Sequence, residues 1–205
     1  MAKAVQKDTS TEEKILEAAK KIFIRQGLAG ARMQDIADEA GINKALLHYY
    51  FRSKDKLFET IFVEVAGQFV PKVNAILNSD SSLFEKIEAF CVEYMDNVSK
   101  NPFIPLFVIN EMNKQPKEFV KKLFGSGSPR FEMFAMQLSD AIRKKEIRKI
   151  DPFELVINTV SLCVFPFLAK PLILLVSGAN EAEFKAMIEE RKRTVPKLII
   201  HSLQP

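Results

Sequence analysis

Apolar residues recur every three or four positions along most of this chain, which is the spacing of one face of an α-helix. Between residues 33 and 40, for example, Met33, Ile36, Ala37 and Ala40 fall on one such face. Polar turns, glycines and prolines separate the periodic segments. The pattern predicts an all-α protein of about nine helices.

Caps, glycines and prolines give the expected ends of these helices. Ser10 and Glu13 fit a capping box that begins the first helix, and Gly27 ends it. Residues 1–9 look frayed, and residues 125–129 form the most flexible-looking stretch. The other helices are expected at residues 33–40, 44–50, 53–77, 83–99, 103–112, 117–124 and 130–145, and then in segments that begin at residues 152 and 180.

Two of the short helices meet at a glycine turn. Gly41 stands where a helix-ending residue must adopt a positive φ, which only glycine does at little cost. Asn43 then offers a side-chain oxygen that can cap the second helix. On that helix Leu47 points inward, and the opposite face carries Lys44, Ala45, His48 and Tyr49. A short helix with a small, basic and aromatic outer face suits the major groove of DNA.

This segment resembles the TetR family of bacterial transcriptional regulators. The resemblance covers residues 9–69 and rests on an ordered set of positions: Ile15-Leu16, Ala18-Ala19, Phe23, Gly27, Ile36-Ala37, Ala40-Gly41-Ile42, Lys44, Leu47, Tyr49, Phe51, Ser53-Lys54 and Leu57. It implies a three-helix helix-turn-helix DNA-binding domain at residues 9–69. A C-terminal helical bundle at residues 70–205 would then serve ligand binding and dimerisation, although there the resemblance is only architectural.

The resemblance also implies which side chains contact DNA. Base contacts are expected from Lys44, Ala45 and Tyr49, and Ala45 is small enough to approach a thymine methyl group. Lys54 is expected at a phosphate, helped by the amides of a helix N-terminus. His48 and Tyr50 are expected to reach phosphates or base edges.

Three positions depart from the family pattern and put the operator sequence in doubt. Arg32 stands where a capping Ser or Thr is common, Leu46 replaces a frequent Thr or Ser, and His48 replaces a frequent Tyr. Each is either a DNA contact or a plain surface residue. Residues 44–56 contain four cationic side chains and one anionic side chain, and this local positive charge favours contact with phosphates.

The C-terminal part is rich in aromatic residues, with 17 phenylalanines and no tryptophan in the whole chain. Such residues at helical spacing either form core or line a cavity for a small hydrophobic ligand, as the resemblance implies. The candidate lining residues are Phe90, Tyr94, Phe103, Phe107, Met112, Phe134, Asn158 and Phe165.

Residues 155–176 contain few polar side chains, which suggests either a membrane span or an interface. Pro166, Lys170 and Pro171 interrupt the run, whereas a span needs about 20 apolar residues without a serious break. A helix that is apolar on all sides can bury one side in its own core and the other in a partner. The resemblance implies a homodimer in which residues 152–168 and 180–203 pair with their copies. Two recognition helices about 34 Å apart would then read a palindromic site.

The remaining composition excludes several other classes. The net charge of +4 is compatible with a polyanionic partner, and the polar N-terminus is unlike a secretory signal, so we expect a cytoplasmic protein without a membrane role. Neither histidine has partners at metal-ligand spacing, and Cys91 and Cys163 are expected as buried thiols. No nucleophile lies beside a base, so neither an enzyme, a cofactor nor a metal is expected. The prediction is a transcriptional regulator, most simply a repressor released by its ligand, with a helical enzyme and a membrane-associated protein as rivals.

Overall fold

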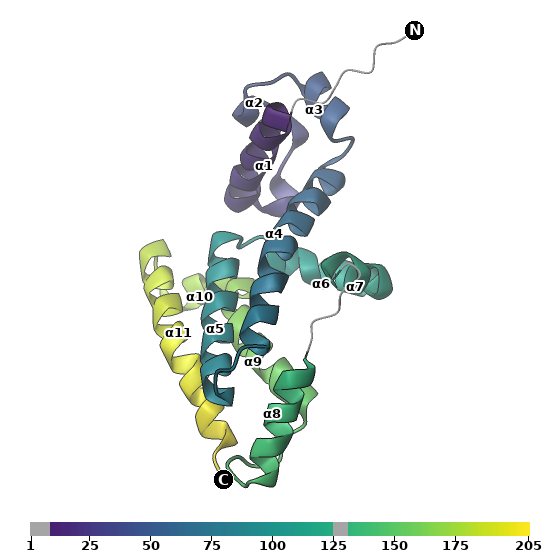
Figure 1. Cartoon of the computed structure of the whole chain (residues 1–205). Coiled ribbons are helices and arrows are strands. Elements are labelled where there is room, and N and C mark those ends of the chain that lie inside the picture. Colours follow the sequence, from purple (N-terminus) through teal and green to yellow (C-terminus); the bar gives the residue numbers. More distant parts are fainter. Residues whose placement is uncertain (1–8, 125–130) are drawn as a thin grey trace. The chain divides into compact units, whose positions relative to one another are not determined.

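The computed structural model describes residues 9–124 and 131–205, so the expectations for residues 1–8 and 125–129 lie outside the described part. The described residues form eleven helices and no strand, which confirms the all-α class (Figure 1). The helices are α1 (Thr9–Gly30), α2 (Met33–Ala40), α3 (Lys44–Tyr50), α4 (Lys54–Leu77), α5 (Leu83–Lys100), α6 (Ile104–Lys114), α7 (Pro116–Phe124), α8 (Glu132–Arg143), α9 (Pro152–Leu168), α10 (Lys170–Ser177) and α11 (Glu181–Leu203).

The chain divides into two compact units, one up to Gly67 and one from Gln68 onward, so the boundary falls inside α4. The N-terminal unit is built on side chains from four helices. Phe23 of α1, Ile36 of α2, Leu47 of α3 and Phe58 of α4 are all buried. The rings of Phe23 and Phe58 pack with their centroids 4.9 Å apart. This small core fixes the orientation of α2 and α3.

Local backbone chemistry ends and restarts the short helices as the sequence predicts. Gly41 adopts the left-handed conformation with φ 67° and ψ 33°, and the amide of Ile42 donates to the carbonyl of Ala37 at 3.0 Å. The Asn43 side chain then accepts a hydrogen bond from the amide of Leu46 at 2.8 Å. Gly27, with φ 67° and ψ 172°, is non-helical and bends α1 before it ends at Gly30.

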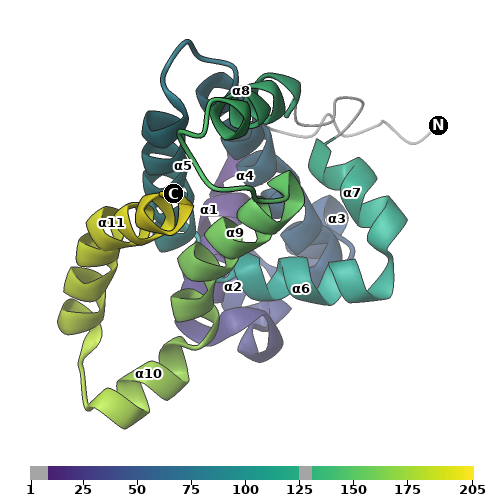
Figure 2. The same ribbon diagram turned by 90° about the horizontal axis from the view of Figure 1, so that it is seen from below.

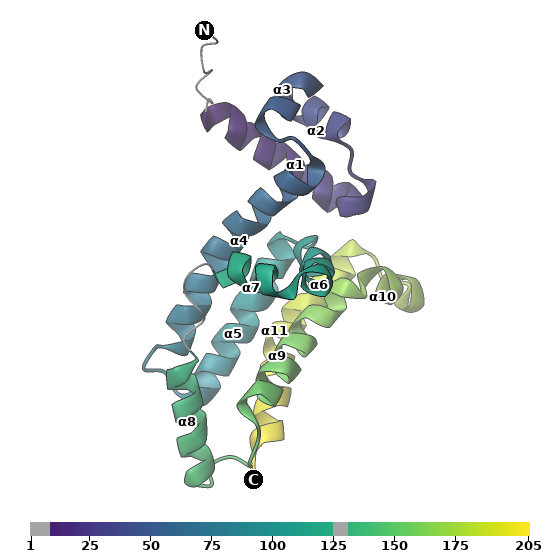
Figure 3. The same ribbon diagram turned by 90° about the vertical axis from the view of Figure 1, so that its right-hand side faces the viewer.

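The C-terminal unit is organised around α5, α9 and α11, which lie side by side (Figures 1 and 3). Their shared core includes Met95 of α5, Cys163 of α9 and Leu203 of α11, none of which is exposed. Polar contacts reinforce the packing. Lys192 of α11 forms an ion pair with Asp96 of α5. Arg191, also on α11, donates to the carbonyl of Leu162 at 2.8 Å.

The apolar run at residues 155–176 is not one helix. The chain breaks at Ala169, and α9 and α10 are bent by 65° relative to each other. Pro171 falls in the first turn of α10, where its missing amide hydrogen costs nothing. α10 buries none of its residues and lies at the edge of the C-terminal unit (Figure 2). The expected total of about nine helices was too low, partly because this break was not assigned as a helix boundary.

By length and composition alone, α4 could cross a membrane, and the α9–α10 pair could do so only as a broken span. One third of the apolar window of α4 is buried inside the protein. Core helices of proteins without membrane spans pass the same test. The feature is therefore weak support for the membrane-associated alternative.

Candidate functional site

The exposed face of α3 carries the side chains that the sequence assigns to DNA. Lys44, Ala45, Leu46, His48 and Tyr49 are all exposed, and the Tyr49 side chain is 48% exposed. The rings of Tyr49 and Tyr50 pack edge to face with their centroids 5.5 Å apart. This short helix thus presents a cation, a small residue and an aromatic hydroxyl together. This is a set of groups that can contact phosphates and base edges.

The opposite face of α3 packs against the protein and holds the exposed face in place. Leu47 is fully buried, and the amide of Phe51 donates to its carbonyl at 2.8 Å. The Nδ1 atom of His48 lies 3.3 Å from the carbonyl oxygen of Arg52, so this ring is oriented along the helix end. The helix is only two turns long, and its buried leucine and its cap compensate for the weak stability of such a short segment.

Lys54 and Arg32 were also expected at DNA. Arg32 is exposed at the N-cap position of α2 and makes no capping hydrogen bond, which leaves its guanidinium available for a phosphate. The ammonium of Lys54 is instead turned toward the protein. It donates to the carbonyl oxygens of Leu28 at 2.7 Å, Ala31 at 3.0 Å and Ala29 at 3.4 Å. These bonds tie the start of α4 to the end of α1, so a phosphate contact by Lys54 stays a prediction.

An ion pair also joins α1 to α2 behind the exposed face. Arg25 donates to the carboxylate of Glu39 at 2.6 Å, and Lys21 approaches the same carboxylate at 3.4 Å. The hydrogen bond from Arg25 holds the pKa of Glu39 below its ordinary value. The carboxylate therefore stays charged under ordinary conditions, and it helps to set the angle between α1 and α2.

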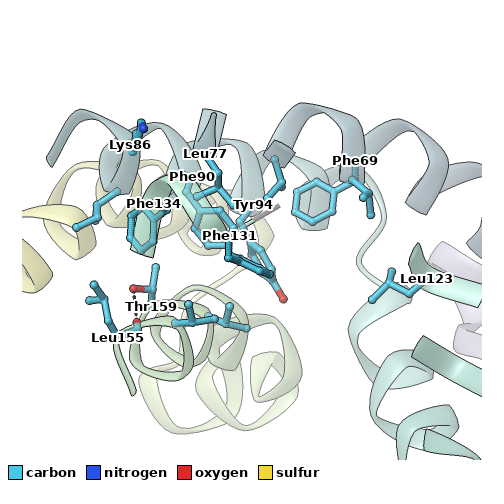
Figure 4. Close-up of a pocket in the computed structure, with 15 residues that line it drawn as sticks. Phe69, Leu77, Lys86, Phe90, Tyr94, Leu123, Phe131, Phe134, Leu155 and Thr159 are labelled. Carbon is cyan, nitrogen blue, oxygen red and sulfur yellow. Dashed lines mark hydrogen bonds between the residues drawn. The ribbon is translucent and has the colours of Figure 1, made fainter. Parts of the chain in front are cut away.

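A separate candidate site is an apolar cavity of about 230 Å³ inside the C-terminal unit (Figure 4). α4, α5 and α9 supply most of its wall. It is lined by Phe69, Val70, Val73, Leu77, Lys86, Ile87, Phe90, Tyr94, Leu123, Phe131, Phe134, Leu155, Val156, Thr159 and Val160. An engineered cavity of roughly 150 Å³ with similar walls stays dry and binds benzene. A cavity of this kind therefore suits a small apolar molecule better than water.

Three of the eight candidate ligand residues line this cavity: Phe90, Tyr94 and Phe134. The other five lie elsewhere. Phe103 and Phe107 are buried in the packing of α6 and its entry. Met112, Asn158 and Phe165 are exposed. The residues of α9 that face the cavity are those at positions 155, 156, 159 and 160. Asn158 lies on the exposed side of the same helix, where it donates to the Glu154 carboxylate at 3.3 Å.

The sequence did not predict the lining residues that α4 and α9 contribute to the cavity. On α4 the lining residues Phe69, Val73 and Leu77 follow each other at intervals of four. That spacing was a usable signal for a shared face. A spacing of four shows that these residues lie on one face of the helix, but it does not show that a cavity lies next to that face.

The core of the C-terminal unit also holds two buried thiols. Cys91 and Cys163 are both free and unexposed, as the sequence predicts. A hydrogen bond with Cys163, together with burial, raises the pKa of the Cys91 thiol. The thiolate is the reactive form of cysteine, so this shift makes Cys91 a poor nucleophile. In the described ranges 9–124 and 131–205, no group of three acidic, histidine or cysteine side chains could hold a metal.

The N-terminal unit and its exposed α3 define a helix-turn-helix DNA-binding protein with an α-helical body. Residues 15–61 match the family model described as bacterial regulatory proteins of the tetR family. This match lies within the N-terminal unit and confirms the resemblance inferred from the sequence.

Among curated proteins, the chain is similar to the HTH-type transcriptional repressor NicS of Pseudomonas putida. The two are 31% identical over 87 residues, which are 41% of this chain and 41% of NicS. The match therefore spans less than half the length of this relative.

Solved structures match over nearly the whole chain and show the fold. A TetR/AcrR-family transcriptional regulator from Thermobifida fusca has a TM-score of 0.62 at 18% identity, over 92% of this chain and 97% of that one. The transcriptional regulator FadR of Bacillus subtilis, in complex with stearoyl-CoA, has a TM-score of 0.64 at 14% identity, over 94% and 99% of the two chains. The C-terminal unit therefore shares the helical architecture of these regulators.

Proposed function

We propose that this protein is a homodimeric transcriptional repressor that binds a palindromic operator and is released from it by a small hydrophobic ligand. The observation that carries the DNA-binding part is the exposed face of α3, held by the buried Leu47 in a domain of the tetR family. NicS, which resembles this domain, is a repressor, and that supports repression as the direction of control. A cytoplasmic location follows from this role, because the operator lies on the chromosome.

The homodimer is supported by apolar residues that the C-terminal unit leaves uncovered. On α9, Phe153 is 71% exposed and Phe165 is 61% exposed, and Leu198 of α11 is exposed as well. Large apolar side chains gathered on two long helices mark an interaction surface. A second copy of the same two helices would cover them and would present two copies of α3 to the two halves of a palindrome.

Ligand control is supported by the cavity. The FadR structure, which shares this fold, holds stearoyl-CoA, a molecule with a long apolar chain. In this chain α4 contributes Phe69 and Val73 to the cavity wall, and its first turns bury Leu57 and Phe58 in the N-terminal unit. A ligand that favours a different position of α4 would lower operator affinity by population shift.

The test is binding of the purified protein to DNA from its own upstream region, measured at several salt concentrations. We expect tight binding to one palindromic site. Replacing Lys44 by Ala should weaken binding and reduce the slope of log affinity against log salt by about 1. Lys117→Ala removes the same charge from an exposed position on α7 and serves as the matched control, with an unchanged slope.

Weak binding that is equal on all sequences would move the search to a genome-wide selection of fragments. If that selection also returned no preferred site, the proposed regulator function would be wrong.

A further inference from the structure

The wall of the cavity in the C-terminal unit carries one charge. Of the fifteen lining residues that the structure describes, Lys86 is the only one with an ionised side chain, and only Tyr94 and Thr159 add polar side-chain atoms. The hydroxyl of Thr159 donates to the carbonyl oxygen of Leu155 at 2.7 Å, within α9. Burial raises the pKa of the Tyr94 phenol, which therefore carries no negative charge under ordinary conditions. The wall thus contains no anion that could pair with Lys86.

Lys86 is a buried lysine rather than a surface one. The residue is only 2% exposed, whereas a lysine that lies along an apolar surface usually keeps its ammonium in water. Within residues 9–124 and 131–205 it forms no ion pair, and its ammonium donates no hydrogen bond. Burial removes the hydration of a charge, so a buried ammonium normally has an acidic partner.

The position of Lys86 on α5 makes this isolation more pronounced. The residue lies near the N-terminus of the helix, where the helix dipole disfavours a cation. The adjacent Glu85 is already engaged in the capping box, since its carboxylate accepts a hydrogen bond from the amide of Ser82 at 2.8 Å. The neighbours three and four positions away on the helix are all uncharged: Ser82, Leu83, Ala89 and Phe90. The helix itself therefore supplies no partner for this charge.

The cavity has a charged end and an aromatic end. On α5, Lys86, Phe90 and Tyr94 follow each other at intervals of four, so they share one face and span about 12 Å along the helix axis. The ring of Tyr94 packs edge to face on Phe69 of α4, with the centroids 5.7 Å apart. Figure 4 shows Lys86 at one end of these residues and Phe69 at the other. A ligand can therefore place a polar head at Lys86 and an apolar tail against the rings.

We infer that the ligand of this cavity is a small monocarboxylic acid with an apolar tail, whose carboxylate pairs with the ammonium of Lys86. One lysine neutralises one negative charge, so a monoanion suits the site better than a dianion such as a phosphate monoester. By proportion to the engineered cavity that holds benzene, the available space suits a molecule of about 10 non-hydrogen atoms. This inference rests on the proposed function, because it names the chemical class of ligand for the same cavity.

The experiment compares three probes on the 205-residue chain. Octanoate and octanamide have the same size and tail and differ in charge, whereas butyrate keeps the carboxylate and shortens the tail. Affinities are measured at neutral pH by isothermal titration calorimetry, with octanamide followed by competition against octanoate. The charged hydrogen bond should make octanoate bind about tenfold more tightly than octanamide. Butyrate should bind about a hundredfold more weakly than octanoate, because it buries four fewer methylene groups.

Two variants locate the ion pair. Lys86→Met removes the charge and keeps a side chain of similar length, so it should weaken octanoate by about thirtyfold or more. Octanamide should then bind more tightly than octanoate, since the carboxylate would lose its hydration without gaining a counter-ion. Lys100→Met makes the same substitution at an exposed position on α5 and is the matched control. It should keep the preference for octanoate.

Stability without ligand gives a second readout, which does not depend on binding. Replacing a buried charge that has no partner by a methionine should stabilise the folded state, so Lys86→Met should lower the unfolding equilibrium constant about tenfold. Chemical denaturation of the ligand-free proteins measures this change, and Lys100→Met should leave the constant within about twofold. A clear loss of stability in Lys86→Met would show that the lysine has a partner within the protein, and this would overturn the inference.

The contrary binding results separate the inference from the proposed function. If none of the probes binds, the ligand part of the proposed function fails together with the inference. If octanamide binds the wild type as tightly as octanoate, the cavity remains a ligand site and the role of Lys86 is wrong. A preference for octanoate that persists in Lys86→Met would place the carboxylate elsewhere. Equal affinities for butyrate and octanoate would show that the tail does not enter the cavity.

Discussion

Two different roles are possible for the side chain of Lys54: a contact with a DNA phosphate, or hydrogen bonds within the protein. The family pattern places it at a DNA phosphate, whereas in the structure its ammonium donates to the carbonyls of Leu28, Ala29 and Ala31. Carbonyls at the end of a helix lack partners within the helix, and a lysine that bonds them stabilises that end. The geometry thus favours a role for Lys54 in fixing the position of α4 against α1.

We therefore expect Lys54→Met to destabilise the protein by roughly 2 kcal/mol, because charge-assisted hydrogen bonds to otherwise unpaired carbonyls are lost. Chemical denaturation of the two proteins measures this difference. Lys56→Met is the control. It removes an equal charge two residues away, where the exposed lysine pairs with Glu59, and it should cost less than about 0.5 kcal/mol.

DNA binding separates the two roles of Lys54. If Lys54 contacts a phosphate, Lys54→Met should reduce the slope of log operator affinity against log salt by about 1. If Lys54→Met has that effect and leaves stability unchanged, the family-based expectation is right and the structural role proposed here is wrong.

At the scale of a helix, the helical period of α3 specifies which of its side chains are buried and which are exposed. Leu46 and Leu47 are neighbours in sequence, but Leu47 is fully buried and Leu46 is 37% exposed. The apolar spacing from Leu47 to Phe51 predicts this difference, since both lie on the inner face. Gly41 and Asn43 fix where the helix begins, so the outer face was predictable almost residue by residue.

Leu46 and Leu47 allow a matched test, because the same Leu→Ala substitution can be made once on the outer face and once on the inner face of α3. Leu47→Ala should cost about 2–5 kcal/mol of stability, because it leaves a void in the small core of the N-terminal unit. Leu46→Ala should leave stability within about 0.5 kcal/mol and change operator affinity instead. Thermal unfolding and DNA binding of both variants provide the measurements.

A result in which both variants unfold alike, with unchanged DNA affinity for Leu46→Ala, would contradict the assignment of Leu46 to the DNA surface. It would leave Lys44 and Tyr49 as the side chains through which α3 reaches DNA.

At the scale of the whole molecule, α9 and α11 leave large apolar residues exposed on the single chain. α10 adds to them, since its Leu175 is 81% exposed. A protein that kept this surface in water would be prone to association. The proposed homodimer gives the surface a defined partner and accounts for the unusual apolar content of residues 155–176.

We expect Phe165→Asp to weaken the dimer by about a hundredfold, because the symmetric interface would bury two unpaired carboxylates. Sedimentation velocity across a range of concentrations measures the shift from dimer to monomer. Met136→Asp introduces the same charge at an exposed apolar residue on α8, outside α9 and α11, and should leave association unchanged. Equal dissociation in both variants, or in neither, would place the interface elsewhere.

The sequence by itself determined the helical class, the ends of the short helices and the outer face of α3. These features depend on the helical period and on local backbone chemistry at residues such as Gly41 and Asn43, which act within a few positions along the chain. Only the tertiary structure decided that Lys54 bonds the end of α1, that the apolar run breaks at Ala169, and that Phe90 and Tyr94 line a cavity while Phe103 and Phe165 do not. A period shows which residues share a face of a helix, but packing between distant segments decides whether that face meets a core, a void or solvent.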